Sequence, residues 1–155
     1  KSAAVTHDHP EGVRGAQAVA GAVFMARNKA GKKAIRAFVE DVFSYDLSAT
    51  LAEIRPHYRF DVTCQGSVPQ AVRAFLEAED FEDAVRNAVS LGGDSDTQAC
   101  IAGSIAEAYF GGVPAHIKAQ TESFLDQRIL TVLQLFDDRE KSCRTFPAET
   151  CPVSV

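Results

Sequence analysis

The sequence has no long apolar run, because no uninterrupted stretch approaches the roughly 20 residues that a helix needs to span a bilayer. Its amino end also lacks the charged-then-apolar pattern of a secretory signal. Basic residues are scattered and fewer than acidic ones, 16 against 21, which gives a net charge of −5. A chain without a basic cluster is poorly suited to nucleic acid or an anionic membrane. We therefore expect a cytoplasmic protein with no nucleic-acid and no membrane partner.

Closely spaced cysteine pairs are missing as well. The four cysteines lie far apart, without CxxC spacing, at positions 64, 100, 143 and 151. Cys100 stands within an apolar helical run, where cysteine usually serves as a small hydrophobe. We expect reduced thiols, and a pairing of Cys143 with Cys151 is left open.

Neither strand alternation nor an internal repeat is present, so the predicted fold class is all-α. A chain of 155 residues with 46% hydrophobic residues can bury one sizeable core. We expect one domain over residues 1–136, followed by a polar tail over 137–155 that is disordered or draped on the globule.

Apolar side chains at three- and four-residue spacing predict the helices. The expected ranges are 13–26, 32–43, a short helix in 47–54, one from Ser67 with a Ser67–Gln70 capping box, 81–91 capped by Asp80, 97–110, and one long helix from Pro114 to Phe136. The stretch 97–110 carries apolar or small residues on nearly every side, which predicts a central helix buried all round.

Asp94, Asp96 and Thr97 stand where a Gly-Gly turn meets the start of this central helix, in "LGGDSDTQACIAGSIAEAYFGG". Helix capping alone could explain one short polar side chain there. A second carboxylate beside a buried helix loses solvation unless something positive compensates it. Magnesium prefers oxygen ligands of this kind, so capping and metal binding both remain open.

Two further segments place polar residues and glycines at a helix start. In "THDHPEGVRGAQA", His9, Glu11 and Gly12 lie either in an ordinary loop or at an anion-binding helix terminus. In "TCQGSV", the capping box accounts for Ser67. The alternative is that Gly66 and Ser67 contact a substrate, through the backbone near Gly66.

Three segments, "THDHPEGVRGAQA", "YRFDVTCQGSVPQAV" and "SLGGDSDTQACIAGSIAEAYFGGVP", resemble in order and spacing the carboxyl half of the ADP-ribosylglycohydrolases, which include dinitrogenase reductase-activating glycohydrolase. The match covers roughly positions 5 to 136, and "GGDSDT" before a small-residue helix is its most specific part. The resemblance implies an orthogonal multi-helix bundle with two magnesium or manganese ions. It implies hydrolysis of the bond between ADP-ribose and an acceptor.

The same resemblance implies roles for particular residues. It assigns metal ligation to Asp94, Asp96 and Thr97, and it places His9, with Glu11 and Gly12, at the ADP-ribose pocket. The implied substrate is an ADP-ribosylated protein or a small ADP-ribose conjugate.

The family also carries two amino-half loops, a glycine-rich loop that contains an acid and a Thr-Asp-Asp-Thr-like loop. They supply the remaining metal ligands and the acid–base carboxylate, and these 155 residues contain neither loop. The resemblance therefore implies the carboxyl half of the fold, inactive without an amino half that would act as its partner. Two alternatives stay open: a binding module for ADP-ribose or a nucleotide, and a helical assembly piece, for which an exposed apolar face would favour oligomers.

Overall fold

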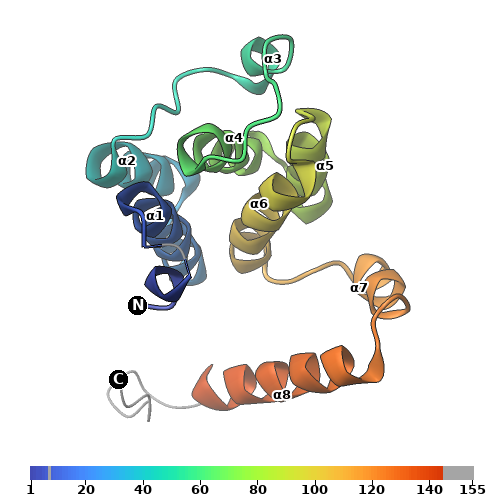
Figure 1. Cartoon of the computed structure of the whole chain (residues 1–155). Helices are drawn as coiled ribbons and strands as arrows, with labels where there is room; N and C mark the ends of the chain where they lie inside the picture. The colour runs from blue at the N-terminus through green and yellow to red at the C-terminus, as the bar shows by residue number, and fades with distance from the viewer. Residues whose placement is uncertain (7, 145–155) are drawn as a thin grey trace. The chain divides into compact units, whose positions relative to one another are not determined.

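The computed structural model describes residues 1–6 and 8–144, with side chains up to residue 139. Every regular element in these ranges is a helix, so the predicted all-α class is confirmed (Figure 1). The chain divides into two units, Lys1–Pro114 and Ala115–Val155, and each is described by itself. The first unit contains η1 (Ala3–Val5), α1 (Pro10–Arg27), α2 (Lys32–Phe43), α3 (Leu51–Ile54), α4 (Cys64–Glu77), α5 (Phe81–Ser90) and α6 (Ser95–Phe110). The second contains α7 (Ala115–Glu122) and α8 (Gln127–Arg144).

Helix α6 is the central helix of the first unit, where it contacts α5, α4 and α1. Small residues on its buried faces, Ala102, Gly103 and Ala106, let these neighbours approach closely. One side of the helix nevertheless stays open, because Cys100 and Glu107 are exposed. The prediction that α6 is buried all round is therefore wrong on this side, and Cys100 is not a core hydrophobe.

The core of the first unit combines small residues on one helix with large residues on its neighbours. In α1, Ala18 and Ala22 are fully buried one turn apart, because residues four positions apart lie on the same face of a helix. The large side chains that fill the space include Ile35, Phe75 and Ile105, each with 0% exposure. The phenyl ring of Phe75 alone removes a large apolar area from water.

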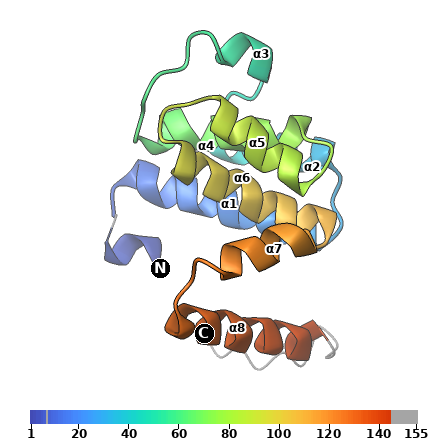
Figure 2. The ribbon, with the colours of Figure 1, turned by 90° about the vertical axis from the view of Figure 1, so that its right-hand side faces the viewer.

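Three helices of the first unit begin at the same edge, as Figure 2 shows for α1, α4 and α6, and these helices contact one another in pairs. Between α1 and α4 the approach is close, since a Cβ at Gly15 would lie 3.1 Å from the Cβ of Cys64. The fold therefore brings the starts of α1, α4 and α6, which carry the three polar segments, to one end of the unit.

Two predicted helix starts are wrong. Helix α4 begins at Cys64, and its N-cap is Thr63, whose side chain accepts a hydrogen bond from the amide of Gly66. Ser67 therefore lies inside the helix and does not cap it. Helix α3 begins only at Leu51, where Thr50 and Glu53 form a capping box. In both cases a threonine just before the helix provides the cap.

The long helix predicted from Pro114 to Phe136 is wrong in its continuity and its end. Two helices, α7 and α8, occupy this part of the second unit. Asp126 separates them, because its carboxylate accepts hydrogen bonds from the amides of Arg128 at 2.8 Å and Ile129 at 3.0 Å. Helix α8 then runs on to Arg144.

The remaining expectations concern the membrane, the cysteines and the domain division. Among the described residues, no helix is both long and apolar enough to cross a membrane. The side chains of Cys143 and Cys151 lie outside the described residues, so their pairing remains open. The division into a domain over 1–136 and a tail over 137–155 stays a prediction.

Candidate functional site

The start of α6 presents two carboxylates and a hydroxyl. Asp94 is the N-cap residue and is half-buried, whereas Asp96 and Thr97 are exposed. The chain enters this turn through Gly92 and Gly93, whose φ angles of +75° and +70° belong to the left-handed region that glycine adopts readily. The Asp94 side chain makes no capping hydrogen bond, so simple helix capping does not account for this residue.

The two carboxylates interact with each other. A side-chain hydrogen bond with Asp94, followed by backbone hydrogen bonds at Thr97 and Asp96, holds the pKa of the Asp96 carboxyl below its usual value. A hydrogen bond between two carboxyl groups requires a proton on one of them, and two neighbouring carboxylates that are both ionised repel unless a cation compensates their charge. This pair therefore has the oxygen donors and the negative charge that a hard divalent cation requires.

Tyr58 joins the start of α6 to the start of α4. Its hydroxyl accepts a hydrogen bond from Gln98 Nε2 at 2.7 Å and donates one to the carbonyl of Gly66 at 2.9 Å. Burial raises the pKa of Tyr58. A hydrogen bond with Ser67 lowers this pKa, and the negative charges of Asp61 and Asp94 raise it. The loop before α4 is thus held against the carboxylate-bearing turn.

Gly66 and Ser67, two predicted substrate contacts, lie in the first turn of α4. A side chain at position 66 would collide with the carboxylate of Asp61. Ser67 is 3% exposed, and its hydroxyl donates to the carbonyl of Asp61 at 3.0 Å. Hydrogen bonding from the Thr63 hydroxyl, and then from its amide, keeps the pKa of Asp61 below its usual value. The substrate role of both residues stays a prediction.

His9 is the N-cap of α1, and its Nδ1 accepts a hydrogen bond from the amide of Glu11 at 3.3 Å. In the neutral imidazole that makes this bond, the other ring nitrogen carries the proton and can donate outward. Glu11 pairs with Arg14 at 3.2 Å, and Arg14 also donates to the carbonyl of Phe43. Gly12 is half-buried in the first turn of the helix.

The predicted site residues are therefore placed on three adjacent helix starts. Hydrogen bonds connect α4 with α6 through Tyr58, and packing connects α1 with α4 at Gly15. Neither Tyr58 nor Gln98 can be identified from the sequence pattern, because one lies in an aperiodic loop and the other in an apolar helix. Across the residues that the structure describes, no group of three or more His, Cys, Asp or Glu side chains could hold a metal ion.

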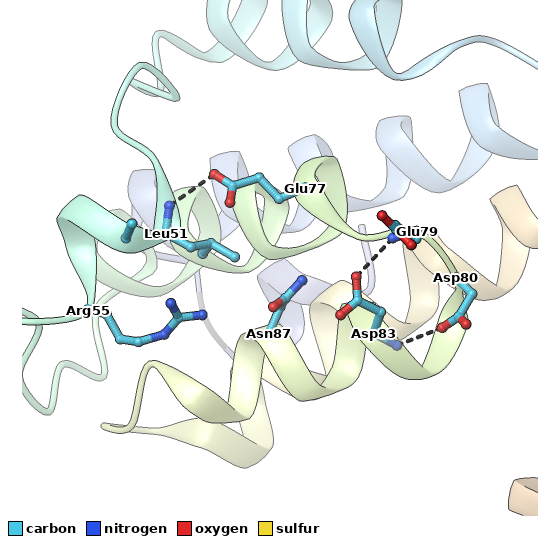
Figure 3. A pocket seen from close by; sticks show the side chains of 8 residues that line it. Leu51, Arg55, Glu77, Glu79, Asp80, Asp83 and Asn87 are labelled. Carbon is cyan, nitrogen blue, oxygen red and sulfur yellow. Dashed lines mark hydrogen bonds between the residues drawn. The ribbon is translucent and has the colours of Figure 1, made fainter.

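A cavity of about 550 Å³ lies elsewhere in the first unit (Figure 3). Its lining residues are Leu51, Ala52, Arg55, Glu77, Glu79, Asp80, Asp83 and Asn87. Three of its four carboxylates accept hydrogen bonds from nearby backbone: Glu77 from the amide of Leu51, Asp83 from that of Glu79, and Asp80 from that of Asp83. These acids stabilise helix ends, and this cavity is not the candidate site.

Residues 1–145 match the model of the ADP-ribosylglycohydrolase family. No curated protein and no solved structure matches the chain. The matched range includes all three helix starts described above.

Proposed function

Because the chain belongs to the ADP-ribosylglycohydrolase family, we propose that it takes part in magnesium-dependent hydrolysis of the glycosidic bond between ADP-ribose and an acceptor. The observation that carries this proposal is the carboxylate pair at the start of α6, where Asp94 occupies the N-cap position without making a capping bond. The proposed substrate is an ADP-ribosylated protein or a small ADP-ribose conjugate.

Asp94, Asp96 and Thr97 would bind the cation. Their donor atoms are all oxygen, which suits magnesium or manganese. When bound, such a cation supplies Lewis-acid polarisation of substrate oxygens and lowers the pKa of a bound water. The contribution of this chain would be to hold two carboxylates at the start of the central helix, where their mutual repulsion favours a bound cation.

These three residues supply only part of a metal centre. Two magnesium ions in octahedral geometry need more ligands than one loop provides, and the described residues contain no group of three or more His, Cys, Asp or Glu that could hold a metal. We propose that the remaining ligands and the acid–base carboxylate come from another segment, such as an amino half. The chain alone would then be inactive.

ADP-ribose would lie beside the carboxylate pair, toward the starts of α1 and α4. The outward ring nitrogen of His9 provides a donor for a phosphate or a ribose hydroxyl, and the amides at the start of α1, near Gly12, favour an anion. Glu11 pairs with Arg14, so its carboxylate would act beside that guanidinium. Ser67 is buried, so contact at Gly66 and Ser67 would involve the backbone.

The metal part of this proposal is tested by melting the chain with and without Mn²⁺. A ligand at about 100 times its dissociation constant stabilises the folded state by about 2.7 kcal/mol, so Mn²⁺ should raise the melting temperature. Asp96→Asn should abolish the rise. Asp41→Asn, which removes an exposed carboxylate on α2, is the matched control and should keep it. An equal rise in both variants would contradict a site at Asp96.

The catalytic part requires a second experiment. The chain is mixed with a folded amino half, an ADP-ribosylated protein and magnesium, and the release of ADP-ribose is measured. We expect release from the mixture and none from either half. Failure of the mixture to release ADP-ribose would contradict the enzymatic proposal. Binding of ADP-ribose that ignores Asp94→Ala and Asp96→Ala would contradict a metal-centred pocket.

A further inference from the structure

A buried amide and a phenol stand directly behind the carboxylate-bearing turn. Gln98 is one residue beyond Thr97, in the first turns of α6, and has 0% exposure. Its Nε2 donates to the hydroxyl of Tyr58 at 2.7 Å, and that hydroxyl donates to the carbonyl of Gly66 at 2.9 Å. One phenol oxygen thus joins two helix starts that are separated by 32 positions, from Gly66 to Gln98.

The ring of Tyr58 also packs against the other side of the turn. At Gly93, the residue before Asp94, a Cβ would lie 2.8 Å from the ring carbon Cε1 of Tyr58 and 3.3 Å from the carbonyl oxygen of Arg59. The residues Asp94–Thr97 are therefore flanked by two contacts with the same side chain, one at Gly93 and one at Gln98.

The hydrogen bonds of Asp96 are not the only support of the turn: Asp94 makes no capping hydrogen bond, and Asp96 and Thr97 are exposed, so contacts from outside the turn also hold it. A buried amide donor is costly to leave unpaired, so the hydrogen bond between Gln98 and Tyr58 holds both side chains in place. A group behind a metal ligand that holds it in place typically changes metal affinity by about 10- to 100-fold when it is removed.

We propose that Tyr58 and Gln98 are positioning residues that hold the Asp94–Thr97 turn in place for the cation, an inference that rests on the proposed function. Neither side chain binds the cation in this scheme. Tyr58 acts through its hydroxyl bond to Gln98 and its ring contact at Gly93, and the carbonyl of Gly66 fixes the direction of the hydroxyl.

Tyr58→Phe tests this role, since it removes the hydroxyl and keeps the ring. Gln98→Leu removes the bond from the other side. Tyr45→Phe is the matched control, because the Tyr45 side chain is equally part of the first unit, is 6% exposed, and has a hydroxyl without a hydrogen-bond partner in the described chain. All three variants keep a bulky side chain and should fold.

The first measurement is hydrogen exchange of the metal-free chain. Amides at positions 94–98 should exchange faster in Tyr58→Phe and Gln98→Leu than in the wild type, while Tyr45→Phe should not change them. This measurement needs no metal, so it tests the positioning role even if the proposed metal site fails. Unchanged exchange at 94–98 in both variants would overturn the inference.

The second measurement is the Mn²⁺ affinity of the folded chain, from free Mn²⁺ in electron paramagnetic resonance. We expect Tyr58→Phe and Gln98→Leu each to bind about tenfold more weakly, and the double variant to add little, because both remove the same bond. Faster exchange with unchanged Mn²⁺ affinity would reduce the pair to a structural role and overturn the inference. Absence of Mn²⁺ binding in the wild type would instead contradict the part of the proposed function that places a cation at Asp94, Asp96 and Thr97.

Discussion

The hydroxyl of Thr63 accepts a hydrogen bond from the amide of Gly66 at 3.1 Å. This bond fixes the start of α4 at Cys64 and places Gly66 and Ser67 within its first turn. The loop that contains Tyr58 and Asp61 therefore ends at Thr63, directly before the start of α4, which carries Gly66 and Ser67. Ser67 is buried in this turn.

Thr63→Ala should destabilise the protein by about 1 kcal/mol, the usual cost of losing an N-cap side chain. Thr63→Ser retains the hydroxyl and should cost much less. Urea denaturation of the three proteins measures the difference. Equal stability of Thr63→Ala and wild type would show that Thr63 does not cap the helix.

The sequence predicts the interior of α4 well and its start poorly. Val68, Val72 and Phe75 are buried, as their spacing predicts, and they would be buried for either helix start. The Ser67–Gln70 pattern matches a capping box, yet the true box is Thr50–Glu53 at α3. A four-residue capping pattern does not by itself locate a helix start, because the start also depends on how the rest of the chain packs.

Glu53→Gln should reduce the dependence of stability on pH in the acid range. Hydrogen bonds from the Thr50 amide and then from its hydroxyl lower the pKa of the Glu53 carboxyl from 4.5. Because the pKa of Glu53 is lower in the folded state, the ionised carboxylate stabilises the fold above pH 4.5. This stabilisation is lost as the pH falls through the folded-state pKa. Denaturation between pH 2 and 7 measures this loss of stability, which should begin as the pH falls below roughly the ordinary carboxyl pKa.

A double-mutant cycle with Thr50→Ala provides the control for this effect. Thr50→Ala removes the hydroxyl but leaves the amide, so Glu53→Gln should have a smaller, but still measurable, effect in that background. Identical effects in both backgrounds would indicate that the hydroxyl of Thr50 does not interact with Glu53.

The candidate site could be predicted only where its residues are neighbours in sequence. Asp94, Asp96 and Thr97 stand in one short motif, and the same helix start holds them together in the structure. Tyr58 meets Gln98 across 40 positions. That contact depends on the packing of α4 against α6, and no periodicity records it, since Gln98 occupies an ordinary buried position of an apolar helix.

Asp126→Ala tests the break between α7 and α8. Removing the carboxylate that accepts from the amides of Arg128 and Ile129 should speed exchange of those amides by roughly fivefold, which corresponds to about 1 kcal/mol for a lost cap. Asp126→Asn keeps a capping side chain and should preserve protection. A continuous helix would give the opposite result, because alanine favours a helix interior over aspartate.

Gly93→Ala should destabilise the protein more than Gly92→Ala, although the two residues are neighbours with nearly the same φ, +70° and +75°. An alanine in the left-handed region costs roughly 1–2 kcal/mol at either position. Only at Gly93 would the new Cβ meet protein atoms, since nothing lies within 4 Å at Gly92. Displacing the Tyr58 ring should add about 1–3 kcal/mol, the usual cost of overpacking. Urea denaturation of both variants gives the difference, in which the shared backbone strain cancels. Equal losses would show that the ring of Tyr58 does not pack on Gly93, and the turn before Asp94 would then lack one of its two contacts with that side chain.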